Sequence, residues 1–243
     1  REQAFFNPGY GSVSKLCTEP RVALQILEAK LAPFLSNGQL SLWLNSKAVA
    51  ATVEGTQVRS LTILDSKGTR CQVQAAYFVD ATELGELLPM TGTDYVTGTE
   101  SKAQTQELHA PEVGSPTNNQ SFTMCFAVDY QDGENHVIPK PIQYDFWKKH
   151  IPSLQPAWSG PLLDLHYSNP RTLEKKLLGF NPQNEDSPGL LNLWQYRRII
   201  DKTNFKPGFY AGDISIINWP QNDYMLGNII DVPAAEYQKH VDN

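Results

Sequence analysis

The chain has 243 residues, enough for one or two domains, and 40% of them are hydrophobic and 19% charged, a composition typical of globular proteins and not of disordered or fibrous ones. Twenty Lys and Arg residues against 26 Asp and Glu residues give a net charge of -6, so no overall basic field favours nucleic acid. The longest apolar stretches are too short to cross a membrane, so we expect no membrane partner.

Cysteine usage and the first residues bear on the compartment. The three cysteines, Cys17, Cys71 and Cys125, are far apart and odd in number, a pattern that fits neither a disulfide framework nor a metal site. We therefore expect buried, reduced thiols. Residues 1–6 show no apolar segment followed by a small-residue cleavage site, so no secretory signal is recognisable. These features favour a cytoplasmic protein.

The first hundred residues predict one helix followed by short strands. Thr18 is a candidate cap for a helix that ends near Pro33, with leucines spaced three and four residues apart along one face. Two turn-forming segments, 54–56 and 65–68, join three of the strands into an antiparallel meander. The strands are predicted at 40–44, 48–53, 58–64, 70–73 and 77–79.

The second half predicts a mainly antiparallel β region with long loops. Residues 99–117 are polar and rich in Ser, Thr, Gln and Pro, so a domain boundary is expected near residue 100. Apolar alternation beyond this point indicates further strands, separated by proline-rich segments that contain short helices. The strands are predicted at 122–128, 190–200 and 213–219, and the helices at 144–150 and 173–178.

Several familiar catalytic and cofactor motifs are absent from the sequence. Gly9-Tyr10-Gly11 begins like a dinucleotide fingerprint, but Ser14 stands where the third glycine is needed and Asn7-Pro8 precedes it in place of a strand. The histidines and cysteines show no metal-ligand spacing, so no metal is expected. No side chain can be named as a catalytic base from the sequence alone.

The most informative stretch is the apolar run 77–79 followed by Asp80-Ala81-Thr82-Glu83-Leu84-Gly85, which places small residues where α/β folds bind ligands. An ordinary strand-to-turn junction is the alternative. With the preceding helix and meander, this D-A-T-E-x-G segment resembles that of the FAD-dependent oxidoreductases with two dinucleotide-binding folds. Further matching segments are 16–22, 193–199 and 218–224.

The resemblance implies an α/β fold, with residues 1–100 as a partial FAD-binding domain and residues 101–243 as a mainly antiparallel β substrate region. Members of this family open with a βαβ unit that carries G-x-G-x-x-G and holds the FAD pyrophosphate. That unit is not in this sequence, so we expect an internal fragment, α+β in itself, whose uncovered face favours self-association.

The resemblance also implies which residues lie near FAD. The loop residues would contact the flavin or let the backbone pass close to it, Val49 would lie near the adenine, and Arg21 near the ribose or pyrophosphate. Plain core packing is the alternative for Val49, and a solvated helix face for Arg21. The candidate FAD-binding residues are Ala81, Thr82, Glu83, Gly85, Val49 and Arg21.

The candidate substrate-binding residues are Arg197, Trp219, Asn222 and Tyr224, which combine a guanidinium, an amide and aromatic rings. Arg197 and Arg198 would point to opposite faces of a strand, so one of them can hold a carboxylate in a forked pair. A surface salt bridge is the alternative for the arginine, and a rigid loop for the segment 218–224.

Taken together, these features predict flavin-dependent oxidation or hydroxylation of a small organic substrate. One alternative is a non-catalytic module whose aromatic rings bind a carbohydrate or another flat ligand. Another is an interaction subunit whose nucleotide-binding unit comes from a second chain.

Overall fold

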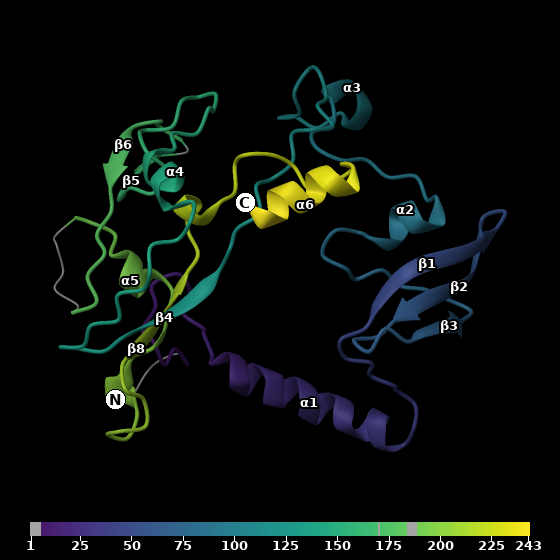
Figure 1. The fold of residues 1–243 in the computed structure, drawn as a ribbon, viewed down its shortest axis with the longest axis horizontal. Helices are drawn as coiled ribbons and strands as arrows, with labels where there is room; N and C mark the ends of the chain where they lie inside the picture. Colours follow the sequence, from purple (N-terminus) through teal and green to yellow (C-terminus); the bar gives the residue numbers. More distant parts are fainter. Residues whose placement is uncertain (1–5, 170, 184–188) are drawn as a thin grey trace. The chain divides into compact units, whose positions relative to one another are not determined.

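A computed structural model of the chain describes residues 6–169, 171–183 and 189–243 (Figure 1). The chain forms two compact units. Unit 1 comprises the described residues within 1–28, 121–227 and 239–243, and unit 2 comprises 29–120 and 228–238. The assignment of residues 1–100 to FAD binding and 101–243 to a substrate region stays a prediction.

Unit 2 contains the predicted antiparallel meander. Strands β1 (Lys47–Glu54), β2 (Gln57–Leu64) and β3 (Arg70–Gln74) lie in the order β1-β2-β3 (Figure 1). The turn between β2 and β3 is closed by Asp65, whose Oδ1 accepts hydrogen bonds from the backbone N–H groups of Lys67 and Thr69, both at 2.8 Å. The strands predicted at 48–53, 58–64 and 70–73 are therefore confirmed.

Two other predicted strands of unit 2 are wrong. Residues 40–44 and 77–79 are not strands in the structure. Tyr77 and Val79 are 89% and 85% exposed, so their β-forming side chains find no sheet face to cover. A strand needs a neighbour for its backbone hydrogen bonds, and propensity alone does not supply one. The short helices α2 (Leu87–Thr91) and α3 (Lys102–Thr105) follow, and α2 packs against β1.

Unit 1 contains a second antiparallel sheet, in the order β4-β8-β7. Strands β4 (Phe126–Tyr130) and β8 (Asp213–Ile217) pair along their whole length, and β7 (Arg198–Ile200) lies on the other side of β8. The strand predicted at 122–128 begins only at Phe126, and the strand predicted at 213–219 ends at Ile217. The chain thus has a mixed α and β structure with small antiparallel sheets.

Two predictions in unit 1 need correction. The segment predicted as one strand over 190–200 contains helix α5 (Leu193–Tyr196) before β7, because Asn192 caps the helix by accepting a hydrogen bond from the backbone N–H of Trp194 at 3.1 Å. The segment 173–178, predicted as a helix, contains strand β6 (Lys175–Leu177), which pairs with β5 (His166–Ser168). Tertiary pairing overrides local helix propensity there.

The core of unit 1 forms around β7, β8 and α5. Ser215 on β8 is fully buried, and its hydroxyl donates to the carbonyl of Trp194 at 2.7 Å, which ties the helix to the sheet. The buried apolar side chains of this core include Leu162, Leu178, Leu193, Trp194, Ile200 and Ile217. This packing fixes the end of β8, from which the loop 218–223 departs.

The longest helix, α1 (Pro20–Ser36), extends three residues past the predicted end at Pro33. The left-handed conformation of Gly38, with φ +76°, ends it instead. The predicted helix at 144–150 is confirmed as α4 (Tyr144–Lys149), and the last helix is α6 (Ala234–Asp242). Short 3-10 turns occupy η1 (Lys202–Asn204) and η2 (Pro220–Asn222).

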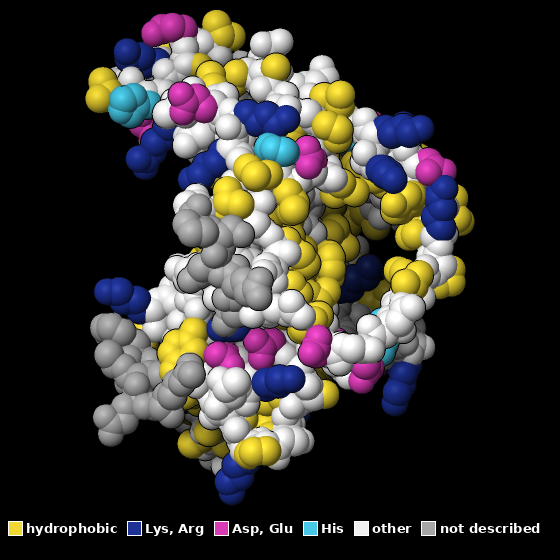
Figure 2. Space-filling view, turned by 90° about the vertical axis from the view of Figure 1, so that its left-hand side faces the viewer, with side chains coloured by type: hydrophobic (Ala, Val, Ile, Leu, Met, Phe, Trp, Pro, Cys, Tyr) yellow, Lys and Arg dark blue, Asp and Glu magenta, His cyan; other side chains and the backbone are white. Residues whose placement is uncertain are grey.

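Many large hydrophobic side chains lie at the surface. None of the residues of α1 is buried, and Leu24 and Leu27 are more than half exposed. Figure 2 shows hydrophobic side chains at the surface of the face in view, interspersed with lysines and arginines. No helix in the described part of the chain is long and apolar enough to cross a membrane.

The three cysteines are free thiols, as predicted, but the expectation that they are buried is wrong. Cys71 and Cys125 are exposed and Cys17 is half-buried. Cys71 lies on β3, which forms an edge of the meander. Side chains on an edge strand remain open to solvent where no further layer covers them.

Candidate functional site

In unit 2, the carboxylate of Asp80 organises the segment that was singled out in the sequence. Its Oδ1 accepts from the backbone N–H of Thr82 at 2.9 Å, and its Oδ2 accepts from that of Leu87 at 3.0 Å, at the start of α2. The hydroxyl of Thr82 accepts from the backbone N–H of Glu86 at 2.8 Å. Asp and Thr at these two positions thus close the loop 80–87 through side chain to backbone bonds.

The closed loop leaves other backbone N–H groups available. Among the described residues, no acceptor bonds the backbone N–H of Ala81, Glu83 or Gly85. Residues 81–84 are exposed, and Gly85 adopts φ +65°, a conformation that favours glycine. Unpaired N–H groups around a turn that contains a left-handed residue form a concave donor surface suited to an anionic or carbonyl oxygen.

Hydrogen bonding also affects the ionisation of the Asp80 carboxyl. The bonds from the backbone and side chain of Thr82 lower the pKa of the Asp80 carboxyl below its usual value of 3.8; partial burial opposes them and the bond from Leu87 adds to them. Asp80 is therefore ionised at neutral pH and holds the loop as a carboxylate.

The two other candidate FAD-binding residues lie in different units. Val49 in unit 2 is the residue at which the register between β1 and β2 shifts, because Ala48 pairs with Ile63 and Ala50 with Thr62. Such a bulge leaves Val49 without a partner on β2. Arg21 is exposed in the first turn of α1, in unit 1. Val49 and the Asp80 loop thus belong to the same unit, whereas Arg21 belongs to unit 1.

A pocket of about 450 Å³ lies beside the Asp80 loop and is formed entirely by unit 2. Leu84, Gly85 and Glu86 contribute to one part of its wall, and the segments around Tyr95 and Ile230 contribute others. The hydroxyl of Tyr95 donates a hydrogen bond to Asp231, which joins two segments distant in sequence. This bond raises the pKa of the Tyr95 phenol, and burial adds to the effect.

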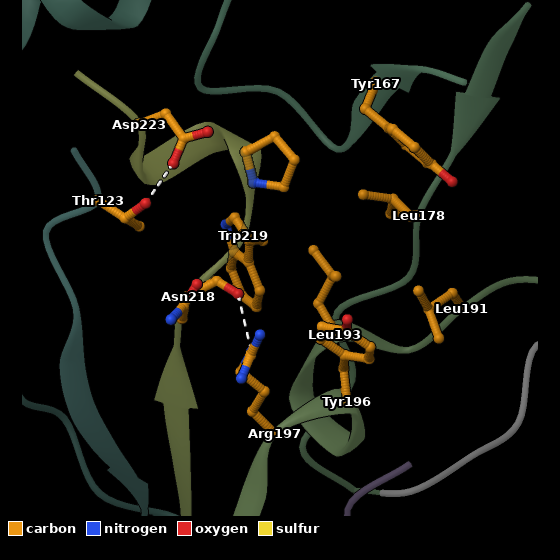
Figure 3. A pocket seen from close by; sticks show the side chains of 11 residues that line it. Thr123, Tyr167, Leu178, Leu191, Leu193, Tyr196, Arg197, Asn218, Trp219 and Asp223 are labelled. Atoms are coloured by element: carbon orange, nitrogen blue, oxygen red, sulfur yellow. Dashed lines mark hydrogen bonds between the residues drawn. The ribbon is translucent and has the colours of Figure 1, made fainter. Parts of the chain in front are cut away.

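A second pocket, of about 350 Å³, lies in unit 1 at the end of β8 (Figure 3). Apolar side chains form most of the wall, and one guanidinium and one carboxylate are added to them. The residues come from the segment before β4, from the hairpin of β5 and β6 and the residue after it, from α5 and its flanking residues, and from the loop after β8. They are Thr123, Tyr167, Leu178, Leu191, Leu193, Tyr196, Arg197, Asn218, Trp219, Pro220 and Asp223.

Arg197 and Arg198 have different environments, but not as opposite faces of one strand, because Arg197 ends helix α5 and only Arg198 belongs to β7. Arg198 is 3% exposed, and its guanidinium donates to Asp213 at 2.9 Å, to Asp201 at 3.3 Å and to the carbonyl of Gly9 at 2.7 Å. Arg197 lines the pocket of unit 1, and its Nε donates to the carbonyl of Asn218 at 3.2 Å. Arg198 is therefore structural, and Arg197 is the arginine available to a ligand.

The same packing explains Gly9 and Gly11. A Cβ atom on Gly9 would lie 2.0 Å from the carbonyl oxygen of Arg198, and one on Gly11 would lie 2.8 Å from it. These glycines are needed because the backbone of residues 198–199 passes so close to them. Their spacing thus reflects close packing within unit 1 and not a phosphate-binding turn.

Asp223 is the carboxylate of the pocket. Its Oδ1 accepts a hydrogen bond from the hydroxyl of Thr123 at 2.6 Å, next to an isolated β-bridge between the two residues. Burial raises the pKa of the Asp223 carboxyl above its usual value of 3.8, and the bond from Thr123 offsets part of this rise. The carboxylate therefore lies where its charge is only partly solvated.

The four candidate substrate-binding residues are only partly brought together. Arg197 and Trp219 both line the pocket of unit 1, whereas Asn222 and Tyr224 are not among its lining residues. The amide of Asn222 donates to the carbonyl of Met124 at 3.2 Å. Tyr224 is 7% exposed and its hydroxyl lies 2.9 Å from Nδ1 of His240. A role in substrate binding stays a prediction for all four.

Sequence reasoning did not single out several residues of this pocket. Thr123, Tyr167 and Leu178 lie far from Trp219 along the chain, and no local pattern marks them. Asp223 lies within the polar and aromatic segment 218–224, which the sequence does mark. Nothing in the sequence marks its hydrogen-bond partner Thr123. Within the described residues, no group of three or more His, Cys, Asp and Glu side chains is placed to bind a metal.

Comparison with known proteins resolves the family. A family model described as FAD dependent oxidoreductase matches residues 3–242, almost the whole chain. The chain belongs to this family. The resemblance inferred from the Asp80–Gly85 segment is thereby confirmed. Neither the curated proteins nor the solved structures give a match. Membership of the FAD dependent oxidoreductase family identifies neither the substrate nor the residues that bind it.

Proposed function

We propose that this chain takes part in a flavin-dependent oxidation or hydroxylation of a small organic substrate, with FAD at the Asp80–Gly85 loop and substrate at the pocket of unit 1. The observation that carries this proposal is the loop itself: a family segment whose side chains close the turn and whose backbone N–H groups at Ala81, Glu83 and Gly85 remain without acceptors.

The residues of the loop fit FAD in character. Ala81 and Gly85 carry little or no side chain, so a planar ring system can approach the backbone closely. The free N–H groups would donate to carbonyl or phosphate oxygens of the cofactor. Val49, at the bulge of β1, would lie toward the adenine as the family resemblance implies. When bound, FAD would supply the redox chemistry.

The protein would contribute position and charge. Arg197 is held by its bond to the carbonyl of Asn218 and would orient an anionic group of the substrate. Trp219 and the leucines of the pocket would exclude water from the rest of the molecule. The carboxylate of Asp223 would accept a hydrogen bond, or a proton, from the same ligand.

The experiment is a titration of the purified chain with FAD, followed by visible absorbance and flavin fluorescence. Quenched flavin fluorescence and a perturbed absorbance band support the proposal. If the chain does not bind FAD, the proposal fails and the pocket of unit 1 is tested as a plain binding module.

A pair of glycine variants makes this test specific to the loop. Gly85→Ala places a Cβ 3.1 Å from Cδ1 of Leu88 in a backbone with φ +65°, so the Leu88 side chain must give way and the backbone is strained. Gly92→Ala carries the same backbone penalty at φ +66° and meets nothing within 4 Å. FAD retention should fall in Gly85→Ala and not in Gly92→Ala. Glu83→Ala should also weaken FAD retention, and unchanged retention would count against its assignment.

A further inference from the structure

The pocket of unit 2 beside the Asp80 loop has charged groups of one sign only. Glu86 and Asp231 are among its lining residues, and no Lys, Arg or His is. We infer that this pocket binds a small organic cation, an amine with an apolar body. The inference goes beyond the proposed function, which assigns FAD to the adjoining loop and no ligand to the pocket itself.

The carboxylate of Asp231 has one partner in the structure and an oxygen available to another. The hydroxyl of Tyr95 donates to its Oδ1, and this is the only hydrogen bond or ion pair of the Asp231 side chain among the described residues. The bond raises the pKa of the Tyr95 phenol, so Tyr95 remains a donor at neutral pH. Oδ2 is therefore the acceptor that an ammonium group would use.

The two segments that carry this pair are held in place by hydrogen bonds of their own. In one, the Asn228 side chain donates to the carbonyl of Ile230 at 2.7 Å and accepts from the backbone N–H of the same residue at 3.0 Å. In the other, the backbone N–H of Gly98 donates to the side chain of Asn119 at 2.8 Å. These bonds form the wall before a ligand arrives, which lowers the entropic cost of binding.

Aromatic and aliphatic residues form most of the remaining wall. Tyr95 and Tyr237 are among the lining residues, and the face of an aromatic ring attracts an ammonium group. The aliphatic lining residues are Leu84, Leu88, Pro89, Val96, Ile229 and Ile230. This lining suits an organic cation better than a metal ion, which needs several oxygen ligands. The volume of about 450 Å³ is within the range of small-molecule sites.

A neighbouring cavity of unit 2 has the same sign of charge. Its volume is about 400 Å³, and it shares Tyr95 and Asp231 with the first pocket. Glu100 adds a further acidic residue, and again no Lys, Arg or His is among the lining residues. The Tyr95 and Asp231 pair therefore lies between two cavities with acidic linings. Such surroundings attract a cation and disfavour an anion.

The test uses three probes that share a phenyl body and differ in charge: the cation 2-phenylethylamine, the neutral 2-phenylethanol and the anion 3-phenylpropionate. Binding to the full chain is measured without FAD by isothermal titration calorimetry. We expect the amine to bind at least about tenfold more tightly than the alcohol, because it adds a charge-assisted contact. The anion is used as a competitor and should not displace the amine. Equal or tighter binding of the alcohol, displacement by the anion, or no binding of the amine overturns the inference.

Two variants assign the contacts. Asp231→Asn keeps an acceptor for Tyr95 and suits the left-handed backbone at φ +54°, and it should weaken amine binding about tenfold or more. Glu86→Gln should cause a smaller loss, and binding of the alcohol should change in neither variant, which shows that both are folded. Glu54→Gln, at an exposed ion pair with Arg59 outside the pocket, is the control and should leave amine binding unchanged.

A further variant, Asp223→Asn, separates the two units, because Asp223 is the carboxylate of the pocket of unit 1. If the amine loses affinity in Asp223→Asn and keeps it in Asp231→Asn, the amine binds in unit 1 and the inference fails. The outcomes are also distinct from those of the proposed function. Amine binding with no FAD uptake would support the inference and defeat the flavin proposal, whereas FAD uptake with no preference for the amine would do the reverse.

Discussion

Thr123 and Asp223 are a hundred residues apart in sequence, yet a hydrogen bond of 2.6 Å joins the hydroxyl of the first to the carboxylate of the second. This contact links the segment before β4 to the loop after β8 at the wall of the unit 1 pocket. It leaves one carboxylate oxygen of Asp223 facing no protein donor among the described residues. The pocket thus holds a carboxylate whose hydrogen bonding is half satisfied.

The first prediction concerns pH. Because burial raises the folded pKa of Asp223 above 3.8, the folded protein keeps this proton to a higher pH than the unfolded chain does. The contribution of Asp223 to the free energy of unfolding therefore falls as pH rises from about 3.8 through the raised pKa, and is constant above it. Urea unfolding of Asp223→Asn across this range should lack that fall. An identical pH profile in both proteins would contradict the assignment.

The second prediction concerns the buried ion cluster of unit 1. Arg198→Met removes the cation that pairs with Asp201 and Asp213 and leaves a buried carboxylate unpaired. We expect the free energy of unfolding to fall by about 3–5 kcal/mol. Chemical denaturation measures this change. The matched Arg59→Met variant removes an exposed ion pair and should lose no more than about 1 kcal/mol. Similar losses in the two variants would show that Arg198 is not structural.

The third prediction concerns the Asp80 loop. Asp80→Asn replaces a carboxylate that accepts from Thr82 and Leu87 with a group that offers one acceptor oxygen. Amide hydrogen exchange at Thr82 and Leu87 should speed up. The larger increase is expected at whichever of the two amides faces the NH2 group and so loses its acceptor. In the unaltered chain the same loosening should appear as pH falls through the lowered pKa of Asp80. Asp94→Asn, on an exposed side chain of the same unit, should leave both amides unchanged.

The fourth prediction concerns self-association, for which α1 provides an exposed apolar surface. Leu27 is 58% exposed on a helix with no buried residue. We expect sedimentation velocity to show association that increases with protein concentration, and Leu27→Glu to reduce it. Gln25→Glu adds the same charge to the same helix without removing apolar surface, and should have a smaller effect. A monomer at every concentration would contradict this prediction.

The sequence by itself determined the local features whose signals are contiguous. Asp65-Ser66-Lys67-Gly68 carries its own turn chemistry, so the meander was predictable. The Asp80–Gly85 segment, together with the preceding helix, the meander and the further matching segments, indicated the family. The strands expected at 40–44 and 77–79 and the helix expected at 173–178 were wrong because sheet pairing depends on neighbours that propensity does not report.

Only the tertiary structure decided the site. The sequence does not distinguish the two adjacent arginines. In the fold, Arg198 is buried beside two carboxylates, whereas Arg197 lines a pocket. Likewise, the raised pKa of Asp223 comes from burial, and long-range packing brings Thr123 into hydrogen-bond contact with it. Charge and desolvation depend on distances in space, and those are fixed by which surfaces of the chain pack against each other.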